Sequence, residues 1–288
     1  MRGIELMANR LIQPQSHPNA LLTHLLPHPM NILVSNDDGY QAPGILALYE
    51  AFKDMGHVMV VAPEQNNSAK SNALTLNSPL YVSQANAHTR FINGTPADCV
   101  HIALTGLLDF RPDLVISGIN NGANMGDDTI YSGTVGAAME AYLMGIPAIA
   151  FSQVKKGWQH LDEAALRARE IVDALISQGR LSRAPGQKVA PWLLNVNMPN
   201  LPRQEHQGFQ ICRLGRRHAA ERVITQENPR GETMYWIGGA GAAKDDAQGT
   251  DFHATRAGFI SITPLQVDLT EHESLSTWGQ ALQGQRLA

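Results

Sequence analysis

The chain has 288 residues, of which 43% are hydrophobic and 17% are charged, so we expect it to fold and to bury a sizeable core. Its 22 basic and 26 acidic residues give a formal net charge of −4, which argues against a DNA-binding protein because such proteins usually carry a basic stripe. The two cysteines, Cys99 and Cys212, exclude a disulfide scaffold and a cysteine-rich zinc site, and they favour the reducing cytoplasm. The most apolar stretch, Ala137–Phe151, contains Glu140 and Pro147, so no membrane-spanning helix is predicted.

The first 29 residues, Met1–Pro29, differ in composition from the rest of the chain. They hold four prolines and three histidines but few charged side chains, and we expect a disordered N-terminal extension because so little apolar surface can be buried. The apolar piece Ala20–Leu26 is interrupted by Thr23 and His24, which argues against a secretory signal. Regular structure is predicted to begin at the residue after Met30, which makes Met30 a candidate for the true start of the chain.

Residues 30–200 alternate between predicted strands and predicted helices. Short apolar runs with β-branched side chains indicate buried strands, and apolar residues at helical spacing, such as Ile45, Leu48 and Phe52, indicate helices. The predicted strands are Asn31–Ser35, Val58–Ala62, Leu114–Ser117, Ile146–Phe151 and Trp192–Val196. The predicted helices are Gly44–Met55, Pro96–Leu108, Thr134–Met144 and Leu161–Ser177. This order implies right-handed crossovers, so the predicted fold class is α/β, with a Rossmann-like, doubly wound and mostly parallel sheet.

The C-terminal third has a different pattern. Val223–Thr225 and Met234–Ile237 flank a turn-rich segment, which indicates a β-hairpin. We expect residues 201–255 to form a β-ribbon that projects from the core for contacts between subunits, and a plain surface insertion is the alternative. Residues 256–288 are predicted to return to the core as a strand and a helix. These two elements are Phe259–Thr263 and Glu273–Leu282.

Ligands of an open parallel sheet bind beyond the carboxyl ends of its strands, and four polar loops are predicted there. In the first loop, Asp37 and Asp38 directly follow a strand, and adjacent carboxylates repel each other unless a cation joins them. An acidic turn or a helix cap is the alternative interpretation. The second loop, Pro63–Ser68, offers neutral amide and hydroxyl oxygens, although by itself it is only a polar loop.

The third loop, Ser117–Asp128, carries amide and carboxylate oxygens and three glycines. A loop of this length without structure of its own is usually functional, and a flexible connection is the alternative. The fourth, Tyr131–Thr134, begins a helix, where backbone N–H groups and two hydroxyls form either an anion site or an ordinary cap. Together the loops predict a dication beside a phosphate cradle. Ligands that are all oxygens favour Mg²⁺ or Mn²⁺ over zinc, so metal-assisted phosphoryl chemistry is the predicted reaction.

Several ordered sequence blocks resemble the SurE family, the survival-protein nucleotidases. The blocks are Asn31–Ile45, Gly94–Val100, Ser117–Asp127, Tyr131–Thr134, Asn195–Pro199 and Thr250–Phe252. The first of them reads NILVSNDDGYQAPGI, and the resemblance extends from Met30 to about Trp278. It implies a Rossmann-like core, a C-terminal hairpin that is exchanged between subunits, and homodimers or homotetramers.

The resemblance also implies an activity, that of a metal-dependent phosphatase with one divalent cation per subunit. Its implied substrates are nucleoside 5′- and 3′-monophosphates and, for some members, short polyphosphate; no nucleic acid or membrane partner is expected. The implied metal ligands are Asp37, Asp38, Ser68 and Asn120. The implied phosphate-binding residues are Asn124, Ser132, Gly133 and Thr134. Asp37 and Asp38 are also the predicted catalytic residues. Either one takes the proton of the attacking water, and direct attack by a carboxylate stays open as an alternative.

The sequence departs from the family pattern in the second loop. Many relatives place an arginine in the loop before the serine, whereas Glu64–Asn67, which precedes Ser68, contains none. The missing charge puts the affinity and preference for substrate in doubt, though not the metal site. It also keeps a second hypothesis open, that of a nucleotide sensor or scaffold that binds metal and phosphate with little turnover.

Other classes of function receive little support from the sequence. No G-x-G-x-x-G follows the first predicted strand, and no G-x-S-x-G occurs, which argues against a nicotinamide-dependent oxidoreductase and a serine hydrolase. His101 is a candidate general acid, although we expect an ordinary helix residue. The basic cluster is either a solvated face or a contact for substrate or a neighbouring subunit. Its members are Arg213, Arg216 and Arg217, and the neighbouring His218 is a separate candidate for contact with substrate from the ribbon.

Overall fold

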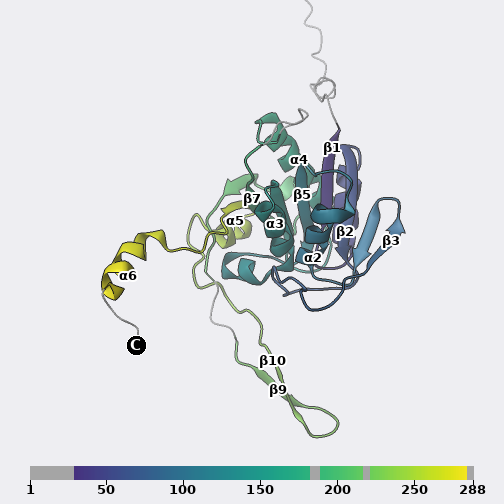
Figure 1. The fold of residues 1–288 in the computed structure, drawn as a ribbon. Coiled ribbons are helices and arrows are strands. Elements are labelled where there is room, and N and C mark those ends of the chain that lie inside the picture. Colours follow the sequence, from purple (N-terminus) through teal and green to yellow (C-terminus); the bar gives the residue numbers. More distant parts are fainter. Residues whose placement is uncertain (1–28, 182–188, 217–220, 284–288) are drawn as a thin grey trace, which may run out of the picture.

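The computed structural model describes residues 29–181, 189–216 and 221–283, which form a large β-sheet with helices on both faces (Figure 1). The strands are β1 (Met30–Ser35), β2 (Gly56–Pro63), β3 (Val82–Asn86), β4 (Thr89–Ile92), β5 (Leu114–Asn121), β6 (Ala148–Val154), β7 (Leu193–Pro199), β8 (Phe209–Ile211), β9 (Ile224–Glu227), β10 (Thr233–Trp236) and β11 (Ile260–Leu265). The helices are α1 (Pro43–Phe52), α2 (Pro96–Ile102), α3 (Gly133–Leu143), α4 (Leu161–Ser177), α5 (Asp251–Arg256) and α6 (Leu275–Leu282). A π-helical turn, Ala103–Leu107, continues α2, and 3₁₀ turns occupy Gly126–Tyr131, Arg203–Glu205 and His272–Ser274. The predicted N-terminal extension up to residue 28, and also Arg217 and His218, lie outside the described residues.

The strand order of the sheet confirms the predicted α/β class. The order is β3-β4-β2-β1-β5-β6-β7-β11-β8, and the six strands from β4 to β7 run parallel to one another. At the centre, Ile32 of β1 lies between Val58 of β2 and Leu114 of β5. The chain winds outward in opposite directions from β1, so the carboxyl ends of β1 and β5 are the point at which sheets of this topology bind ligands.

Each face of the sheet is covered by its own pair of helices. Ile32 and Val34 of β1 pack in the core formed with α1 and α4, whereas Leu33 packs in the core formed with α2 and α3. This division follows from the alternation of side chains along a strand. Phe52 is fully buried on the first face and Val135 on the second. Because both faces are covered, β1 carries the unbroken apolar run Ile32, Leu33 and Val34, which is the pattern from which this strand was predicted.

The third predicted loop is shorter than expected because β5 continues to Asn121. The pairing of β5 with β6 shifts its register between Ser117 and Asn120 and resumes with Asn120 opposite Ser152. A 3₁₀ turn then begins at Gly126. The expectation of a long loop without structure of its own was therefore wrong, because the glycines and asparagines of this segment form an irregular strand end.

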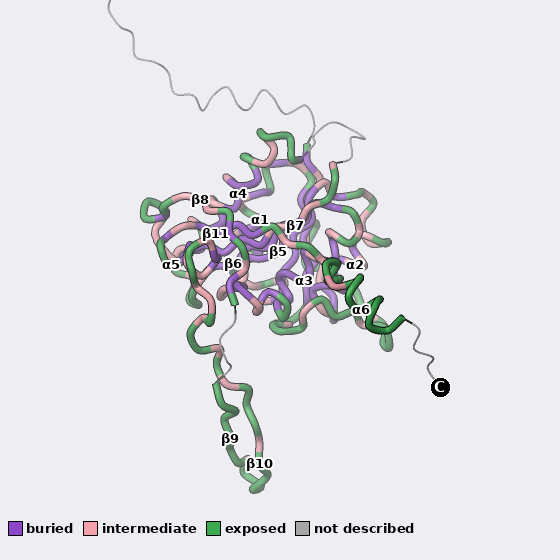
Figure 2. Tube along the Cα trace, turned by 90° about the vertical axis from the view of Figure 1, so that its left-hand side faces the viewer, coloured by how far each residue is buried: buried purple, intermediate pink, exposed green. Residues whose placement is uncertain are grey.

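The C-terminal third differs from the expected ribbon and returning helix. Within residues 201–255, β8 pairs with β11 in the large sheet and α5 lies against β7 and β11, so only β9 and β10 project as a hairpin (Figure 1). Helix α6 forms where a helix was predicted, but it has no buried residue and stands apart from the sheet (Figure 2). Its apolar side chains Leu275, Trp278 and Leu282 are exposed. None of the helices described, α6 included, has the length and apolarity needed to cross a bilayer.

Gly44 allows α1 to approach β5 closely. A Cβ atom at this position would lie 2.0 Å from the carbonyl oxygen of Ile119 and 3.0 Å from the ring of Trp158. We expect Gly44→Ala to lower the free energy of unfolding by about 2–4 kcal/mol, because helix and strand must move apart. Gly106→Ala is the matched control, since no atom lies within 4 Å of its Cβ position, and it should change stability by less than about 1 kcal/mol. Equal midpoints of urea unfolding for the two variants would contradict this close approach.

Candidate metal and phosphate site

The carboxyl end of β1 meets the first turn of α3. Asp37 follows β1, and its side chain is only 3% exposed. The hydroxyl of Thr134 in α3 donates a hydrogen bond to Asp37 Oδ1 at 2.5 Å. A Cβ atom at Gly133 would lie 2.8 Å from the Cβ of Asp37, so only glycine permits this approach. The first and fourth polar loops of the sequence are therefore in direct contact.

Asp38 is half-buried and is held by the other two loops. Asn66 Nδ2 donates to Asp38 Oδ1 at 3.2 Å, and the backbone N–H of Asn121 donates to Asp38 Oδ2 at 3.3 Å. The second loop is fixed in place by the backbone N–H of Asn67, which donates to the carbonyl oxygen of Asp37 at 2.7 Å. All four polar loops thus converge on the two aspartates, as the topology of the sheet predicts.

The two carboxyl groups lie in an environment that disfavours their charged form. Burial raises the pKa of Asp37 from 3.8 to about 6; the hydrogen bond from Thr134 lowers it and repulsion from Asp38 raises it. Burial also raises the pKa of Asp38, and the Asn121 N–H, the charge of Lys156 and the Asn66 amide oppose that rise. A bound cation would stabilise the negative charge of both carboxylates and so offset their burial and mutual repulsion.

The predicted metal ligands Asn120 and Ser68 are held in place by neighbouring groups. Asn120, at the end of β5, donates its amide Nδ2 to the carbonyl oxygen of Gly122 at 2.8 Å, which leaves its Oδ1 as the ligand atom. Ser68 is exposed, and its backbone N–H donates to Asn66 Oδ1 at 2.9 Å. Ser68 is therefore linked to Asp38 through Asn66. Within residues 29–181, 189–216 and 221–283, no group of three or more His, Cys, Asp or Glu side chains could hold a metal. The candidate donor set is thus two carboxylates with neutral oxygens, which suits a hard cation.

The start of α3 provides the anion side of the site. Ser132 is the N-cap, and its Oγ accepts a hydrogen bond from the backbone N–H of Val135 at 3.1 Å. The backbone N–H groups of Gly133 and Thr134 belong to the first helical turn, which has no carbonyl partners of its own. The Thr134 N–H also bonds to Asp37, so the Ser132 hydroxyl proton and the Gly133 N–H are the candidate donors to a phosphate.

Asn124, a predicted phosphate-binding residue, is bound instead within the protein. It is buried, its Nδ2 donates to Ser152 Oγ at 2.8 Å, and its backbone N–H donates to Asn197 Oδ1 at 2.8 Å. The side-chain amides of Asn195 and Asn197 both donate to its carbonyl oxygen. These contacts give Asn124 the role of fixing the turn after β5, and a contact with phosphate stays a prediction.

Three residues of the site were not among the predicted ligands. Asn66 and Asn121 bind Asp38, and Asp251 at the start of α5 accepts hydrogen bonds from the backbone N–H groups of Gly126 and Gly215, both at 2.8 Å. Asp251 is fully buried, and it joins the turn after β5 to the C-terminal third. The signal for it was the block Thr250–Phe252, whose structural reason the sequence alone did not reveal.

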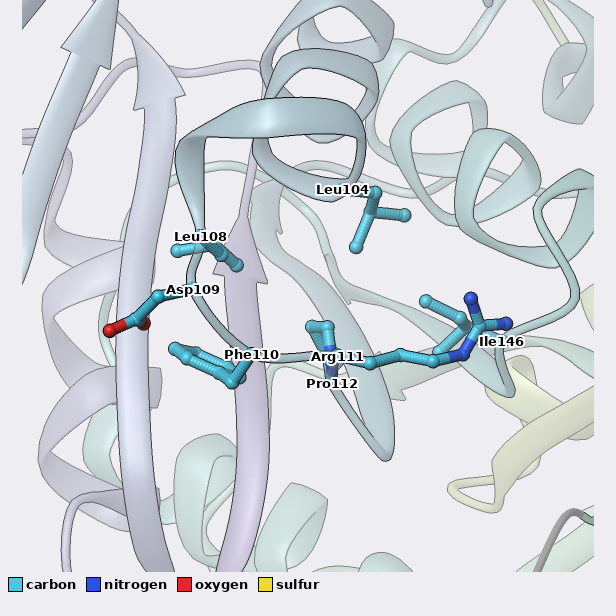
Figure 3. Close-up of a pocket in the computed structure, with 7 residues that line it drawn as sticks. All are labelled: Leu104, Leu108, Asp109, Phe110, Arg111, Pro112 and Ile146. Atoms are coloured by element: carbon cyan, nitrogen blue, oxygen red, sulfur yellow. The ribbon is translucent and has the colours of Figure 1, made fainter. Parts of the chain in front are cut away.

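A separate cavity of about 270 Å³ lies at the amino ends of β5 and β6, whereas the aspartates follow the carboxyl end of β1 (Figure 3). Leu104 lines it from the π-helical turn and Leu108 from the residue after that turn, together with Arg111 and Ile146, which precede β5 and β6. Arg111 Nη2 donates to the carbonyl oxygens of Met144 and Gly145, so its guanidinium caps the end of α3. The cavity is therefore distinct from the aspartate site.

Two further candidate groups have partners within the protein. His101 Nδ1 lies 2.7 Å from Glu140 Oε1, where it joins α2 to α3, as expected for an ordinary helix residue. Of the basic cluster, Arg213 pairs with Asp245 at 2.8 Å. Arg216 lies 3.5 Å from Asp127. These arginines form ion pairs close to the 3₁₀ turn before α3.

The fold and the site define a class: a doubly wound α/β protein with paired aspartates at the carboxyl edge of its sheet. A family model described as Survival protein SurE matches residues 32–221. The chain is 69% identical over 252 residues to the 5′-nucleotidase SurE of Polaromonas naphthalenivorans (strain CJ2), which covers 87% of this chain and 97% of that protein. It is 70% identical over 253 residues to the 5′-nucleotidase SurE of Polaromonas sp. (strain JS666 / ATCC BAA-500), with 88% and 97% covered.

A solved structure agrees with these relatives. The crystal structure of the SurE protein from Aquifex aeolicus superposes with a TM-score of 0.74 at 40% sequence identity and covers 87% of this chain and 99% of that one. The chain therefore belongs to the SurE family, as its sequence blocks predicted.

The raised pKa of Asp37 leads to a prediction about stability in the absence of metal. The folded protein holds the Asp37 proton more tightly than the unfolded chain does, so stability rises as the pH falls through about 6, and the rise is complete below the ordinary pKa of 3.8. At pH 8, in EDTA, we expect Asp37→Asn to be more stable than the wild type by about 1–3 kcal/mol, because the buried charge is removed. The gain should disappear near pH 4, where the wild-type carboxyl is protonated in the folded state.

Asp109→Asn is the control for this comparison, because Asp109 is exposed. It should change stability by less than about 0.5 kcal/mol at either pH. Urea unfolding followed by circular dichroism measures all three proteins, and a stability difference for Asp37→Asn that does not depend on pH would contradict the prediction.

Proposed function

We propose that this chain is a metal-dependent 5′-nucleotidase that hydrolyses nucleoside 5′-monophosphates to a nucleoside and phosphate. The observation that carries the proposal is the contact of Asp37 with the first turn of α3, since it joins a cation-binding group to an anion-binding group. The curated relatives from both Polaromonas strains are named 5′-nucleotidases and align over nearly their full length. We extend the proposal to nucleoside 3′-monophosphates and short polyphosphate, which present the same terminal phosphate group.

A divalent cation fits the residues of the site. Asp37, Asp38, Asn120 and Ser68 would hold it through oxygen atoms, and Mg²⁺ or Mn²⁺ suits such donors. The raised pKa values of both aspartates support this assignment, because a cation favours their charged form. When bound, the cation supplies Lewis-acid polarisation of the phosphoryl oxygens.

The residues of the chain have separate tasks in the proposed reaction. Ser132 and the Gly133 N–H hold the phosphate oxygens and stabilise the charge that develops on them. Gly133 has no side chain, and the space this leaves is filled by Asp37, which stays in contact with the start of the helix. Thr134 donates to Asp37 Oδ1 and fixes the orientation of that carboxylate. Asp38, which is more accessible than Asp37, is the better placed of the two to take a proton from the attacking water.

The proposed activity is tested by release of phosphate from a panel of nucleoside 5′- and 3′-monophosphates and short polyphosphate. Protein stripped with EDTA should be inactive and should regain activity with Mg²⁺ or Mn²⁺. We expect Asp38→Asn to lower kcat/KM by about 100-fold or more, because it removes one charge from the cation site and the proposed proton acceptor. Asp109→Asn, an exposed change of the same kind, should retain activity. No phosphate release with any metal, from folded protein that still binds nucleotide, would refute the enzyme and favour a nucleotide sensor.

We also propose that the active form is a homodimer or homotetramer. The projecting hairpin and α6 expose large apolar side chains, among them Ile237 at 93% and Trp278 at 62%. Clusters of exposed apolar side chains on projecting elements are typical of surfaces that contact another subunit. The free, buried cysteines, Cys99 and Cys212, support a reducing compartment, and we propose the cytoplasm.

The mass of the protein in solution, measured by light scattering as it elutes from a size-exclusion column, tests the proposed oligomer. We expect a mass of two or four chains for the wild type and a lower mass for Ile237→Asp, since a buried carboxylate in the interface is costly. Leu76→Asp is the control, because Leu76 is 84% exposed but lies in the loop after β2. A monomeric wild type, or equal masses for both variants, would contradict the role of the hairpin.

A further inference from the structure

A positive side chain reaches the site from the loop between β6 and α4. The Cγ and Cε atoms of Lys156 both lie 3.8 Å from the position that a Cβ atom at Gly122 would occupy. The Nδ2 atom of Asn120 lies 4.0 Å from the same position. The aliphatic stem of Lys156 therefore lies across the turn that follows Asn120, one of the predicted metal ligands. The charge of Lys156 acts on Asp38 and lowers the pKa of that carboxyl group.

The backbone that follows Lys156 is anchored to the site and to the core. The backbone N–H of Gly157 donates to Asn121 Oδ1 at 2.9 Å, and the backbone N–H of Asn121 in turn donates to Asp38 Oδ2 at 3.3 Å. Trp158 packs against the apolar core beneath α1. Lys155 and Trp158 have positive φ angles of 69° and 61°, so the loop turns sharply on either side of Lys156. Lys156 is thus presented by an anchored turn.

The positive charge of Lys156 offsets the repulsion between the two carboxylates of the site and an incoming phosphate. A phosphate monoester is close to a dianion at neutral pH and is repelled by two carboxylates. The loop Pro63–Ser68, on the other side of Asp38, contains no lysine or arginine and includes Glu64. Lys156 is exposed, so its ammonium group is accessible to a ligand that enters from solvent.

We propose that Lys156 is a substrate-binding residue that attracts the phosphoryl group of the incoming nucleotide and holds it on the Asp38 side of the site. The start of α3 then contacts the same group from the Asp37 side. The proposal rests on the proposed nucleotidase function, and it specifies a ligand with a terminal phosphate dianion. An uncharged nucleoside gains nothing from this side chain.

The test compares Lys156→Gln with Lys156→Arg and with Lys155→Gln, which makes the same charge change one residue away. For hydrolysis of AMP with Mn²⁺, we expect Lys156→Gln to raise KM roughly fivefold while kcat stays within about twofold, because an accessible charge contributes binding more than chemistry. Inhibition by inorganic phosphate should weaken by a similar factor, and inhibition by adenosine should not change. Lys156→Arg should restore most of the affinity, and Lys155→Gln should resemble the wild type. The kcat/KM of Lys156→Gln should also depend less on ionic strength.

Calorimetric binding of inorganic phosphate to the Mn²⁺-loaded proteins separates this proposal from the proposed function. If the wild type releases no phosphate from AMP yet binds phosphate more tightly than Lys156→Gln, the nucleotidase function fails and the role of Lys156 stands. If Lys156→Gln binds phosphate as well as the wild type, or if it lowers kcat with KM unchanged, the role of Lys156 is overturned. Equal losses in Lys156→Gln and Lys155→Gln would also overturn it, since a general effect of loop charge would then be the cause.

Discussion

The burial of Asp37 against the start of α3 is the constraint on which the candidate site depends. The hydrogen bond from Thr134 and the absence of a side chain at Gly133 bring a carboxylate within contact of a helix N-terminus. In that position Asp37 accepts hydrogen bonds from backbone N–H groups, and the helix dipole favours its negative charge. Burial nevertheless raises the pKa of Asp37 to about 6. The fold therefore holds Asp37 where its negative charge is unfavourable unless a cation or a proton neutralises it.

A second layer of buried polar side chains keeps this arrangement rigid. Asp251 and Asn197 bind backbone N–H groups of the segment that follows β5, and Asn195 binds the carbonyl oxygen of Asn124. Such groups are costly when unsatisfied, so each bond restricts the chain to one path. The consequence is that the C-terminal third, through Asp251, helps to position loops that belong to the first half of the sheet.

The sequence was sufficient for the parallel centre of the sheet, for the four helices that cover it and for the convergence of four loops, because these follow from apolar periodicity and from the geometry of parallel strands. It did not predict the short elements β3, β4, β8 and α5. The sequence was insufficient where only the contacts of a side chain in the folded protein decide its role. Asn124 and Asn66 are both asparagines in polar loops, yet Asn124 is bound by internal partners and Asn66 binds Asp38. Helix α6 has apolar residues at helical spacing, but that pattern does not specify whether the covering surface belongs to the same chain.

The charge of the site links the stability of the folded protein to the binding of a cation or a proton. Any ligand that binds the folded protein and not the unfolded chain shifts folding in proportion to its affinity, and a cation at Asp37 would remove the same burial penalty that a proton removes. Proton and cation then compete for one carboxylate, so each weakens the binding of the other. Lys156 acts on the other carboxylate, since its charge favours the anionic form of Asp38, the second proposed ligand of the cation. The buried contact of Asp37 with α3 depends on Thr134 and Gly133, whereas Lys156 is exposed, so the fold tolerates a substitution at Lys156 more readily than one at Asp37.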